Sequence, residues 1–355
     1  MHPLIVTAVL ALNLGPMGPD SPAREPQLAA NGSTVALAFG AGNAIYFSAS
    51  HDSGRTFSEP VKVEQAKIVP LTRHRGPRIV MFGNTIVISA VTGKTPSQAQ
   101  HAHGLPSDGD LLLWRSTDGG KSWSQAIRVN DVPGAPTEGL HTLAADAKGN
   151  LFAAWLDNRT GKGTTLYGAR SLDAGATWSK SFLIYESPDG TICQCCHPSA
   201  AFMPGGELLV MWRNWLGGSR DMYVARSRDG APFAKPEKLG KGTWKLNACP
   251  MDGGGLVVSQ QHVFTAWRRE GNVYMAEPGG QELALGQGKD VAMAVGPKGV
   301  YVAWNSTAGI DLRPPDGSAV KLSNAGGFPA ITVLADGSVV AAWEEKDSIT
   351  VKRLN

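Results

Sequence analysis

The stretch Ser116-Thr-Asp118-Gly-Gly120-Lys-Ser-Trp123 decides the fold of this chain, because its pattern recurs along the sequence. Similar stretches run from Ser50 to Phe57 and from Ser171 to Trp178, and a fourth, from Ser227 to Phe233, is one residue short. Ser and Asp side chains can close a turn by bonding nearby backbone N–H groups, Gly permits a positive φ, and the aromatic residue can pack inward. We therefore expect these stretches to be structural turns rather than catalytic motifs.

A second pattern recurs more often and consists of an apolar strand that often ends in Ala-Trp. Its spacing of about forty to sixty residues, with short strands and tight turns between the copies, is typical of a β-propeller. Seven copies predict an all-β propeller of seven four-stranded antiparallel blades, with six blades as the alternative. We expect the strand-end tryptophans to pack between blades rather than to bind sugars. The seven strands are Val35–Phe39, Ile86–Ala90, Leu151–Trp155, Leu208–Trp212, Val263–Trp267, Val300–Trp304 and Val339–Trp343.

The N-terminus, residues 1–25, allows two interpretations, whereas residues 26–355 form the predicted propeller domain. Residues Pro3 to Leu14 are an apolar run before a Gly/Pro/Ser-rich stretch, as in a signal peptide, although no Lys or Arg precedes the run. That interpretation predicts a secreted or periplasmic protein. Alternatively, because the last repeat ends after three strands near Leu354, the N-terminus supplies a strand that closes the ring.

The Ser/Asp/Gly/aromatic stretches resemble the Asp-boxes, S-x-D-x-G-x-x-W/F, of the sialidase-like propellers. In that family the boxes lie on the face opposite the active site, and the family includes exo-α-sialidases, which are glycoside hydrolases. If the boxes lie at the bottom between third and fourth strands, functional residues belong at the starts of first strands and the ends of second strands. Loops converge around the axis there, on the top face.

Several ionisable residues fall at these top-face positions. Three arginines of a sialidase bind the sugar carboxylate through bidentate guanidinium bonds, and Arg78, Arg213 and Arg268 resemble them in position. The resemblance also implies a carboxylic acid/base, for which Asp108 or Asp110 is the candidate, and a glutamate, for which Glu138 is the candidate. No tyrosine falls at the mouth to serve as the family's nucleophile, since Tyr167, Tyr223 and Tyr274 lie in third strands. Arg159 and His141 complete the predicted substrate-binding set.

The four cysteines gather at the starts of two neighbouring blades and suggest either disulfides or a metal site. In an oxidising compartment they would form bridges, such as one from Cys193 to Cys249. The alternative is a metal site made by Cys195, Cys196, His197, Cys249 and Met251. Thiolate, imidazole and thioether ligands together favour copper, and the C-x-C-C-H order differs from a typical zinc motif. The glycan-binding interpretation requires no cofactor.

Charge and hydropathy exclude two classes of partner. The formal net charge is only +3 and no long basic run occurs, which argues against nucleic acid. No internal stretch of eighteen apolar residues is present, so we expect no membrane span. The predicted partner is a glycan or another anionic small molecule, and a non-catalytic binding propeller remains the alternative to an enzyme.

Overall fold

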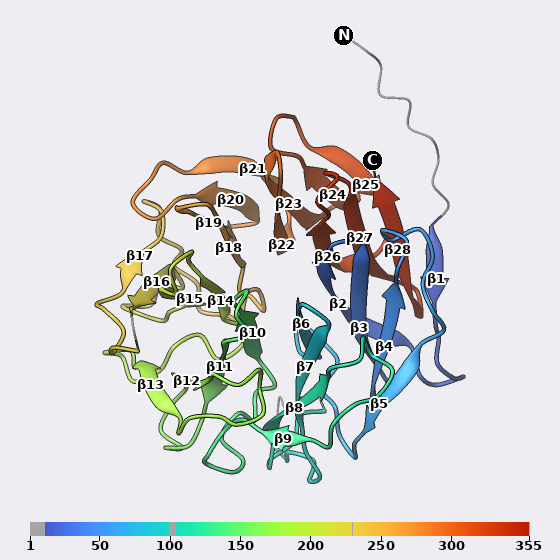
Figure 1. Cartoon of the computed structure of the whole chain (residues 1–355). Helices are drawn as coiled ribbons and strands as arrows, with labels where there is room; N and C mark the ends of the chain where they lie inside the picture. Colours follow the sequence, from blue (N-terminus) through green and yellow to red (C-terminus); the bar gives the residue numbers. More distant parts are fainter. Residues whose placement is uncertain (1–10, 99–103, 229, 355) are drawn as a thin grey trace.

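The computed structural model describes residues 11–98, 104–228 and 230–354, and these residues form a seven-bladed β-propeller. Seven four-stranded sheets ring one axis, and the first strand of each blade lies innermost (Figure 1). All the strand pairs within the blades are antiparallel; those next to the axis, for example, pair β2 with β3 and β6 with β7. The predicted all-β class and the count of seven blades are confirmed, and the alternative of six is wrong.

Blades one to six each use four consecutive strands, counted outward from the axis. They are β2 (Ala23–Asn31), β3 (Thr34–Ala41), β4 (Ala44–Ser50) and β5 (Val61–Gln65); β6 (Arg78–Phe82), β7 (Thr85–Thr92), β8 (Asp110–Ser116) and β9 (Ile127–Arg128); β10 (His141–Ala145), β11 (Leu151–Asp157), β12 (Thr165–Ser171) and β13 (Phe182–Tyr185); β14 (Ser199–Phe202), β15 (Leu208–Arg213), β16 (Met222–Ser227) and β17 (Glu237–Lys238); β18 (Gly255–Ser259), β19 (His262–Arg269), β20 (Asn272–Ala276) and β21 (Leu283–Gln287); β22 (Lys289–Gly296), β23 (Gly299–Ser306), β24 (Gly309–Arg313) and β25 (Val320–Ser323).

Blade seven joins the two ends of the chain. Its inner strands are β26 (Gly327–Val333), β27 (Val339–Glu345) and β28 (Ser348–Leu354), and its outermost strand is β1 (Leu12–Leu14). Leu12 and Leu14 of β1 lie opposite Val351 and Ile349 of β28 and pack against the same apolar cluster. The N-terminal apolar run thus supplies the closing strand, while residues 1–10, which hold most of the predicted signal segment, lie outside the described residues.

The first strand of blade one starts earlier than the expected domain boundary at residue 26. β2 begins at Ala23, and its pairing with β3 shifts register between Arg24 and Gln27. Glu25 has a φ of 55° at this bulge, which lets the strand continue through Pro26. The bulge also turns the Glu25 side chain into the protein, where it is 2% exposed.

The Asp-box turns are built as the sequence predicts. Ser116 Oγ accepts the N–H of Gly120 and donates to Asp118 Oδ1, each at 2.7 Å. Gly120 has a φ of 91°, and a Cβ there would lie 2.2 Å from the Phe47 ring of the preceding blade. Trp123 meets Phe47 edge to face, with 5.2 Å between ring centroids. Each box therefore pins its blade to the one before it, which is a structural role.

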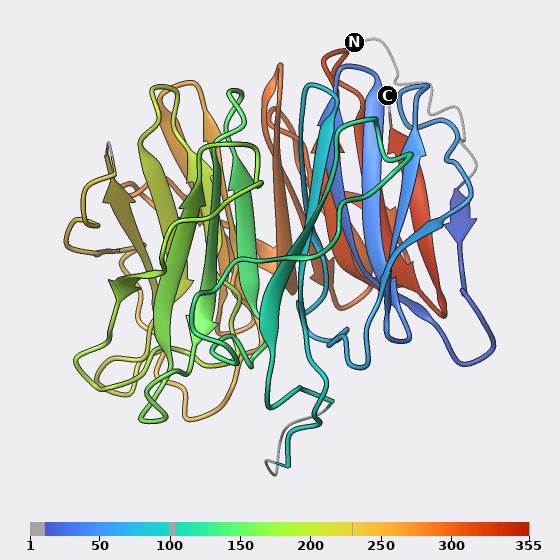
Figure 2. The ribbon, with the colours of Figure 1, turned by 60° about the horizontal axis from the view of Figure 1, so that its bottom comes forward.

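These turns orient the molecule. They join third to fourth strands, and because neighbouring strands are antiparallel, first strands begin on the opposite face, where second strands end. Figure 2 shows the strands running between the two faces. The top face, defined by the starts of β2, β6, β10, β14, β18, β22 and β26, is therefore the place to look for a site.

The tryptophans at the ends of second strands are core residues. Trp155 packs against Val87 and Leu113 of blade two, and Trp212 packs against Phe152 of blade three. Fully burying a large apolar side chain stabilises a fold by roughly 1.5–3 kcal/mol. Strand-end packing, rather than sugar stacking, explains the repeated tryptophan; the set, each at most 2% exposed, is Trp155, Trp212, Trp267, Trp304 and Trp343.

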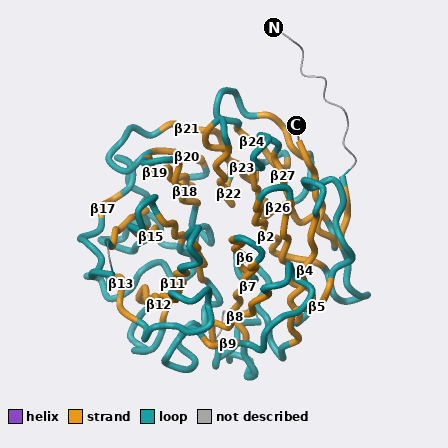
Figure 3. Tube along the Cα trace, in the orientation of Figure 1, coloured by secondary structure: helices purple, strands orange, loops and turns teal. Residues whose placement is uncertain are grey.

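Strands and loops account for the whole described chain, as Figure 3 shows. Residues 11–98, 104–228 and 230–354 accordingly contain no helix with the length and apolar character needed to cross a membrane.

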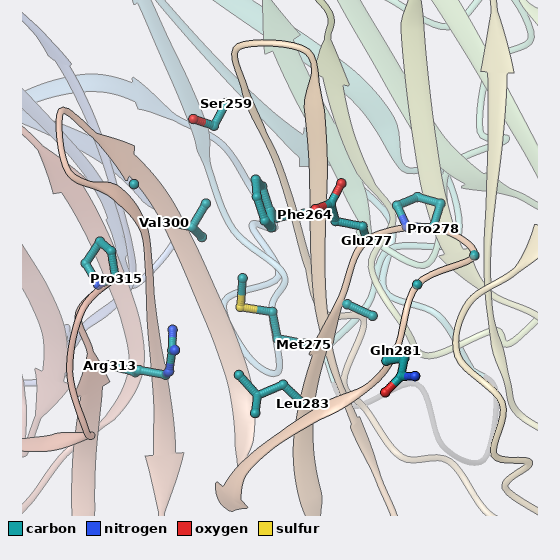
Figure 4. Close-up of a pocket in the computed structure, with 14 residues that line it drawn as sticks. Ser259, Phe264, Met275, Glu277, Pro278, Gln281, Leu283, Val300, Arg313 and Pro315 are labelled. Carbon is teal, nitrogen blue, oxygen red and sulfur yellow. The ribbon is translucent and has the colours of Figure 1, made fainter.

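A hollow of about 690 Å³ lies between blades five and six, where an Asp-box aromatic is missing (Figure 4). Phe264 and Met275 of blade five and Val300 of blade six form its apolar lining. In blades one to three the box turn covers the preceding blade, but the corresponding turn of blade six carries Pro315. The hollow lies beside the turns of the bottom face and is separate from the axial residues described next.

Candidate functional site

An axial cavity of about 270 Å³ is lined by the first strands of all seven blades. Most of its wall is small or apolar, as at Ala200 and Leu256. Its charged and titratable lining comes from His74, Arg78 and His197. Residues far apart in the sequence therefore meet at the axis, as the propeller prediction requires.

His74 is held across the axis by an unusual backbone. The loop before β6 gives Arg73 and His74 φ values of 57° and 66°, and each such non-glycine residue costs of order 1–3 kcal/mol. The imidazole of His74 packs against His197 of blade four, with centroids 4.5 Å apart and ring planes tilted by 37°, and meets the Phe328 ring of blade seven at 5.2 Å. Its Nε2 lies 2.9 Å from Asp290 Oδ1 of blade six. The strained loop thus places one imidazole in contact with three other blades.

A hydrogen-bonded chain connects His74 to carboxyl groups of three blades. The N–H of Glu25 donates to Glu344 Oε1 at 2.7 Å, and the N–H of His74 donates to Glu25 Oε1 at 2.8 Å. Beyond the His74 ring, Asp290 Oδ2 accepts from Asn305 Nδ2 at 3.1 Å. The chain therefore runs from blade seven through blades one and two to blade six.

Burial separates the protonation states of these carboxyl groups. Burial raises the pKa of Glu344 to about 8, with help from nearby Glu25, whose own pKa burial raises to about 6. Burial opposes ionisation of Asp290 as well, but the hydrogen bond and charge of His74 outweigh it and lower the pKa of Asp290. The same contact raises the pKa of His74 against the effect of burial. Near neutral pH the site therefore combines a Glu344 carboxyl group that burial keeps largely protonated with an Asp290 carboxylate that His74 keeps ionised, which is the separation that acid–base catalysis needs.

The same residues include one imidazole and two carboxyl groups, a donor set that suits a transition-metal ion better than Mg²⁺ or Ca²⁺. One ligand atom each from His74, Asp252 and Asp290 lie within 4.8 Å of one another. Asp252 is fully buried, and its Oδ1 has no hydrogen-bond partner among the described residues. His74 Nε2 already lies 2.9 Å from Asp290 Oδ1, and burial together with the charge of Asp290 raises the pKa of Asp252, so these contacts and not a metal ion account for the group as it stands.

The three predicted carboxylate-binding arginines do not form one cluster of free guanidinium groups. Arg78 lines the axial cavity, with NH2 donating to His74 O at 2.6 Å. Arg213 is 1% exposed, and its three nitrogens donate to backbone carbonyl oxygens. Arg268 lies over the Trp244 ring at 5.3 Å and is not part of the cavity wall. Arg213 therefore ties loops together, and of the three only Arg78 faces the cavity.

Two further predicted residues are engaged within their own blades. Arg159 makes two bonds of 2.8 Å to Asp157 and lies 3.7 Å from the centroid of the Tyr167 ring. Asp108 Oδ1 accepts the N–H groups of Lys94 and Thr95, and although burial opposes it, these bonds lower the pKa of Asp108. A carboxylate with a lowered pKa that closes a loop is poorly suited to act as the predicted acid.

Neither of the remaining two predicted residues lines the cavity: His141 is buried, whereas the Glu138 side chain is 24% exposed. His141 is fully buried, its Nε2 lies 2.9 Å from Ser89 Oγ, and burial lowers its pKa to about 3. Burial raises the pKa of Glu138, whose carbonyl oxygen accepts Arg75 Nε at 2.6 Å. Sequence reasoning named neither His74 nor the Glu25–Glu344 pair as site residues, although all three occupy top-face positions.

The four cysteines form a separate cluster between blades four and five. Cys193 Sγ lies 2.7 Å from Cys196 Sγ and 3.6 Å from Cys195 Sγ, and Met251 packs against the group. All four cysteines are free, so the expected disulfides are not supported. His197 turns away from the cluster towards the axis, and its Nε2 lies 3.1 Å from Gly254 O. The predicted metal set is therefore only partly assembled, and Cys193 takes the place expected for His197.

Comparison with known proteins agrees with this architecture. Residues 44–243 match the model of the BNR repeat-like domain. The Penicillium chrysogenum α-L-arabinanase, solved with arabinobiose, is 15% identical with a TM-score of 0.56, over 97% of this chain and 98% of that one. The Hadza microbial sialidase Hz136 is 14% identical with a TM-score of 0.52, over 90% and 76%. A family 25 polysaccharide lyase, an ulvan lyase, is 11% identical with a TM-score of 0.56, over 94% and 93%. These structures share the fold; comparison with curated proteins found no match.

Proposed function

This chain belongs to the BNR repeat-like domain family, and we propose that the axial end of its top face binds a carbohydrate and cleaves a glycosidic bond by acid–base chemistry. One observation carries the proposal. At the His74 side of the axial cavity, Glu344, whose pKa burial raises, and Asp290, whose pKa the contact with His74 lowers, are joined through Glu25 and His74. Carboxyl groups of opposite ionisation are the usual means of glycoside hydrolysis, one donating a proton and the other stabilising or activating.

The roles follow from the environment of each group. Glu344 is 14% exposed and protonated near neutral pH, so it is the proposed general acid for the leaving oxygen. Asp290 is ionised but only 2% exposed, so it would act through His74, which it orients. The imidazole of His74 would accept the proton of the water that attacks the sugar, while Glu344 protonates the leaving oxygen as the glycosidic bond breaks. His74, at 12% exposed, would contact the sugar together with Arg78.

The cavity also favours a class of substrate. Its volume of about 270 Å³ lies just below the roughly 300–1,000 Å³ of sites for drug-sized ligands. One sugar unit rather than a chain suits that space, which supports exo-acting cleavage. A sialidase-type reaction is less well supported, because Arg213 is committed to carbonyl oxygens and no tyrosine is found among the residues described as lining the cavity.

The test is a panel of chromogenic glycosides and short oligosaccharides, sialosides included, assayed with the full chain. Glu344→Gln should reduce kcat on the best substrate by roughly 10²–10⁴-fold, the usual contribution of a general acid, while leaving binding measurable by calorimetry. Glu186→Gln, at an exposed glutamate in the loop after β13, is the matched control.

Binding without turnover in the wild-type protein would favour the non-catalytic alternative. If no carbohydrate in the panel is bound or cleaved, the proposal fails. It also fails if Glu344→Gln cleaves the substrate as fast as Glu186→Gln.

A further inference from the structure

We infer that the four-cysteine cluster between blades four and five binds one Cu(I) ion, independently of the proposed sugar site. Cys193, Cys195 and Cys196 lie in the loop before β14, and their sulfur atoms are within 4.8 Å of one another. Cys249, in the loop before β18, contacts Cys195 from the next blade. Two loops of different blades thus bring four thiols to one place.

The charge around the cluster suits an anionic metal–thiolate centre. Arg220 is 4% exposed, and its NH1 lies 3.1 Å from Cys193 Sγ. Among the described residues, no carboxylate lies within ion-pair distance of Arg220. Buried charges are normally paired, because an unpaired one is costly to desolvate. A monovalent ion held by three or more thiolates carries a net negative charge, which would give this guanidinium an ionic partner in addition to the Trp215 ring, 4.0 Å away, and Leu246 O, 3.2 Å from its Nε.

The donor set distinguishes among thiophilic metals. Thiolate ligands suit both Cu(I) and Zn(II), and four cysteines alone would also make a structural zinc site, whereas a thioether ligand is typical of copper sites and not of zinc sites. Met251 packs against the thiols, and a φ of 59° at Met251 gives this loop a backbone conformation that non-glycine residues rarely adopt. His197, the imidazole that zinc would favour, lies at the axis instead. Although Cys193 and Cys196 have the C-x-x-C spacing common in zinc sites, the complete set favours Cu(I).

Exposure differs among the four thiols in a way that suggests how the ion would reach the site. Cys193, Cys195 and Cys196 are at most 5% exposed, whereas Cys249 is exposed. Cys249 is therefore the thiol that an incoming ion or a donor molecule would meet first, and through its contact with Cys195 it would then share the ion with the buried thiols. A metal bound to both loops would also link blade four to blade five.

The experiment is anaerobic titration of the reduced full chain with Cu(I) in competition with bathocuproine disulfonate, a chromophoric Cu(I) chelator. We expect one Cu(I) withheld per chain. Cys195→Ser and the exposed-site variant Cys249→Ser should each weaken binding by at least about 10-fold, and Met251→Leu by a smaller factor. Met81→Leu, in β6, is the matched control for the methionine, and circular dichroism verifies that each variant is folded.

Two results would overturn the inference. One is a wild-type protein that gives up all Cu(I) to the chelator, including the case in which it retains Zn(II) instead. The other is a folded Cys249→Ser or Cys195→Ser variant that binds Cu(I) as tightly as Met81→Leu does. A selective loss of Cu(I) affinity in Met251→Leu, with Zn(II) affinity unchanged, would support the thioether as a ligand.

Discussion

Replacing Glu344 with glutamine should make the stability of the propeller less sensitive to alkaline pH. The Glu344 side chain is 14% exposed, and its Oε1 accepts the N–H of Glu25. Glutamine keeps a carbonyl oxygen for that bond but cannot ionise. The substitution therefore removes the titration while retaining the hydrogen bond.

The magnitude follows from the difference between folded and unfolded states. The pKa of Glu344 is raised from 4.5 to about 8 in the folded protein. Between these values the folded state binds the proton and the unfolded state has lost it, so the free energy of unfolding falls as pH rises. A tenfold change in an acid dissociation constant corresponds to about 1.4 kcal/mol, so the raised pKa of Glu344 can lower the free energy of unfolding by at most ~5 kcal/mol. Relaxation around the buried carboxyl group reduces the expected loss to about 2–4 kcal/mol between pH 5 and pH 9.

The assay is urea unfolding of both proteins at pH 5, 7 and 9, followed by tryptophan fluorescence. Glu25 and His74 also have raised pKa values and weaken the fold as pH rises, so only the difference between wild type and variant isolates Glu344. The exposed Glu186→Gln should show the wild-type slope. If Glu344→Gln loses as much stability from pH 5 to pH 9 as wild type does, the buried-acid argument is refuted.

Three further substitutions test other parts of the structure. Arg213→Leu removes the donors for three backbone carbonyl oxygens, each worth roughly 1–3 kcal/mol when left without a partner, so urea unfolding should show a loss of about 3–5 kcal/mol. A neutral result would contradict the structural role. The pKa of His141 is lowered to about 3 in the folded protein, so its contribution to stability is lost as pH falls from 6.5 towards 3. His141→Gln should therefore lose less thermal stability than wild type between pH 7 and pH 4, as measured by thermal melts. Equal losses of stability would argue against a buried neutral imidazole. Leu14→Asp should loosen the closing strand and speed hydrogen exchange of β28 amides opposite it, with blade three as the unaffected control; unchanged exchange would count against closure by β1.

The fold was predictable from the sequence because its signals are local and repeated. Ser116 and Asp118 close their turn with bonds that reach only a few residues along the chain, and Trp155 and Trp343 mark the same position in two blades. Seven copies of the apolar strand predict seven blades, even where a single copy departs from the common sequence. The closing strand was harder to assign, since Leu12 and Leu14 suit either a strand or a signal segment.

The site was predictable in position but not in composition. Arg213 and Glu344 both follow a strand-end tryptophan, yet Arg213 donates to carbonyl oxygens of irregular loops. The repeat pattern does not predict the conformation of these loops, so it could not predict this role. His74 lies at the axis because two consecutive residues, Arg73 and His74, adopt positive φ values. Neither residue type predicts such a backbone conformation. Glu25 was assigned to the expected leader, because the bulge that turns it inward interrupts the strand pattern.

The residue that follows the strand-end tryptophan differs from blade to blade. These differences give a fold of seven similar blades a site that is not symmetric about the axis. In blade four this residue is Arg213 and in blade five Arg268, whereas in blade six it is Asn305 and in blade seven Glu344. The first pair anchors loops beside the thiol cluster, and the second pair joins the axial hydrogen-bonded chain. The two arginines and the Asn305–Glu344 pair therefore lie in different blades, and His74 contacts groups from both sides, through His197 of blade four and Asp290 of blade six. A sugar bound at the axis would meet its proton donor from the side of blade seven, which makes Glu344 the residue on which the catalytic proposal depends.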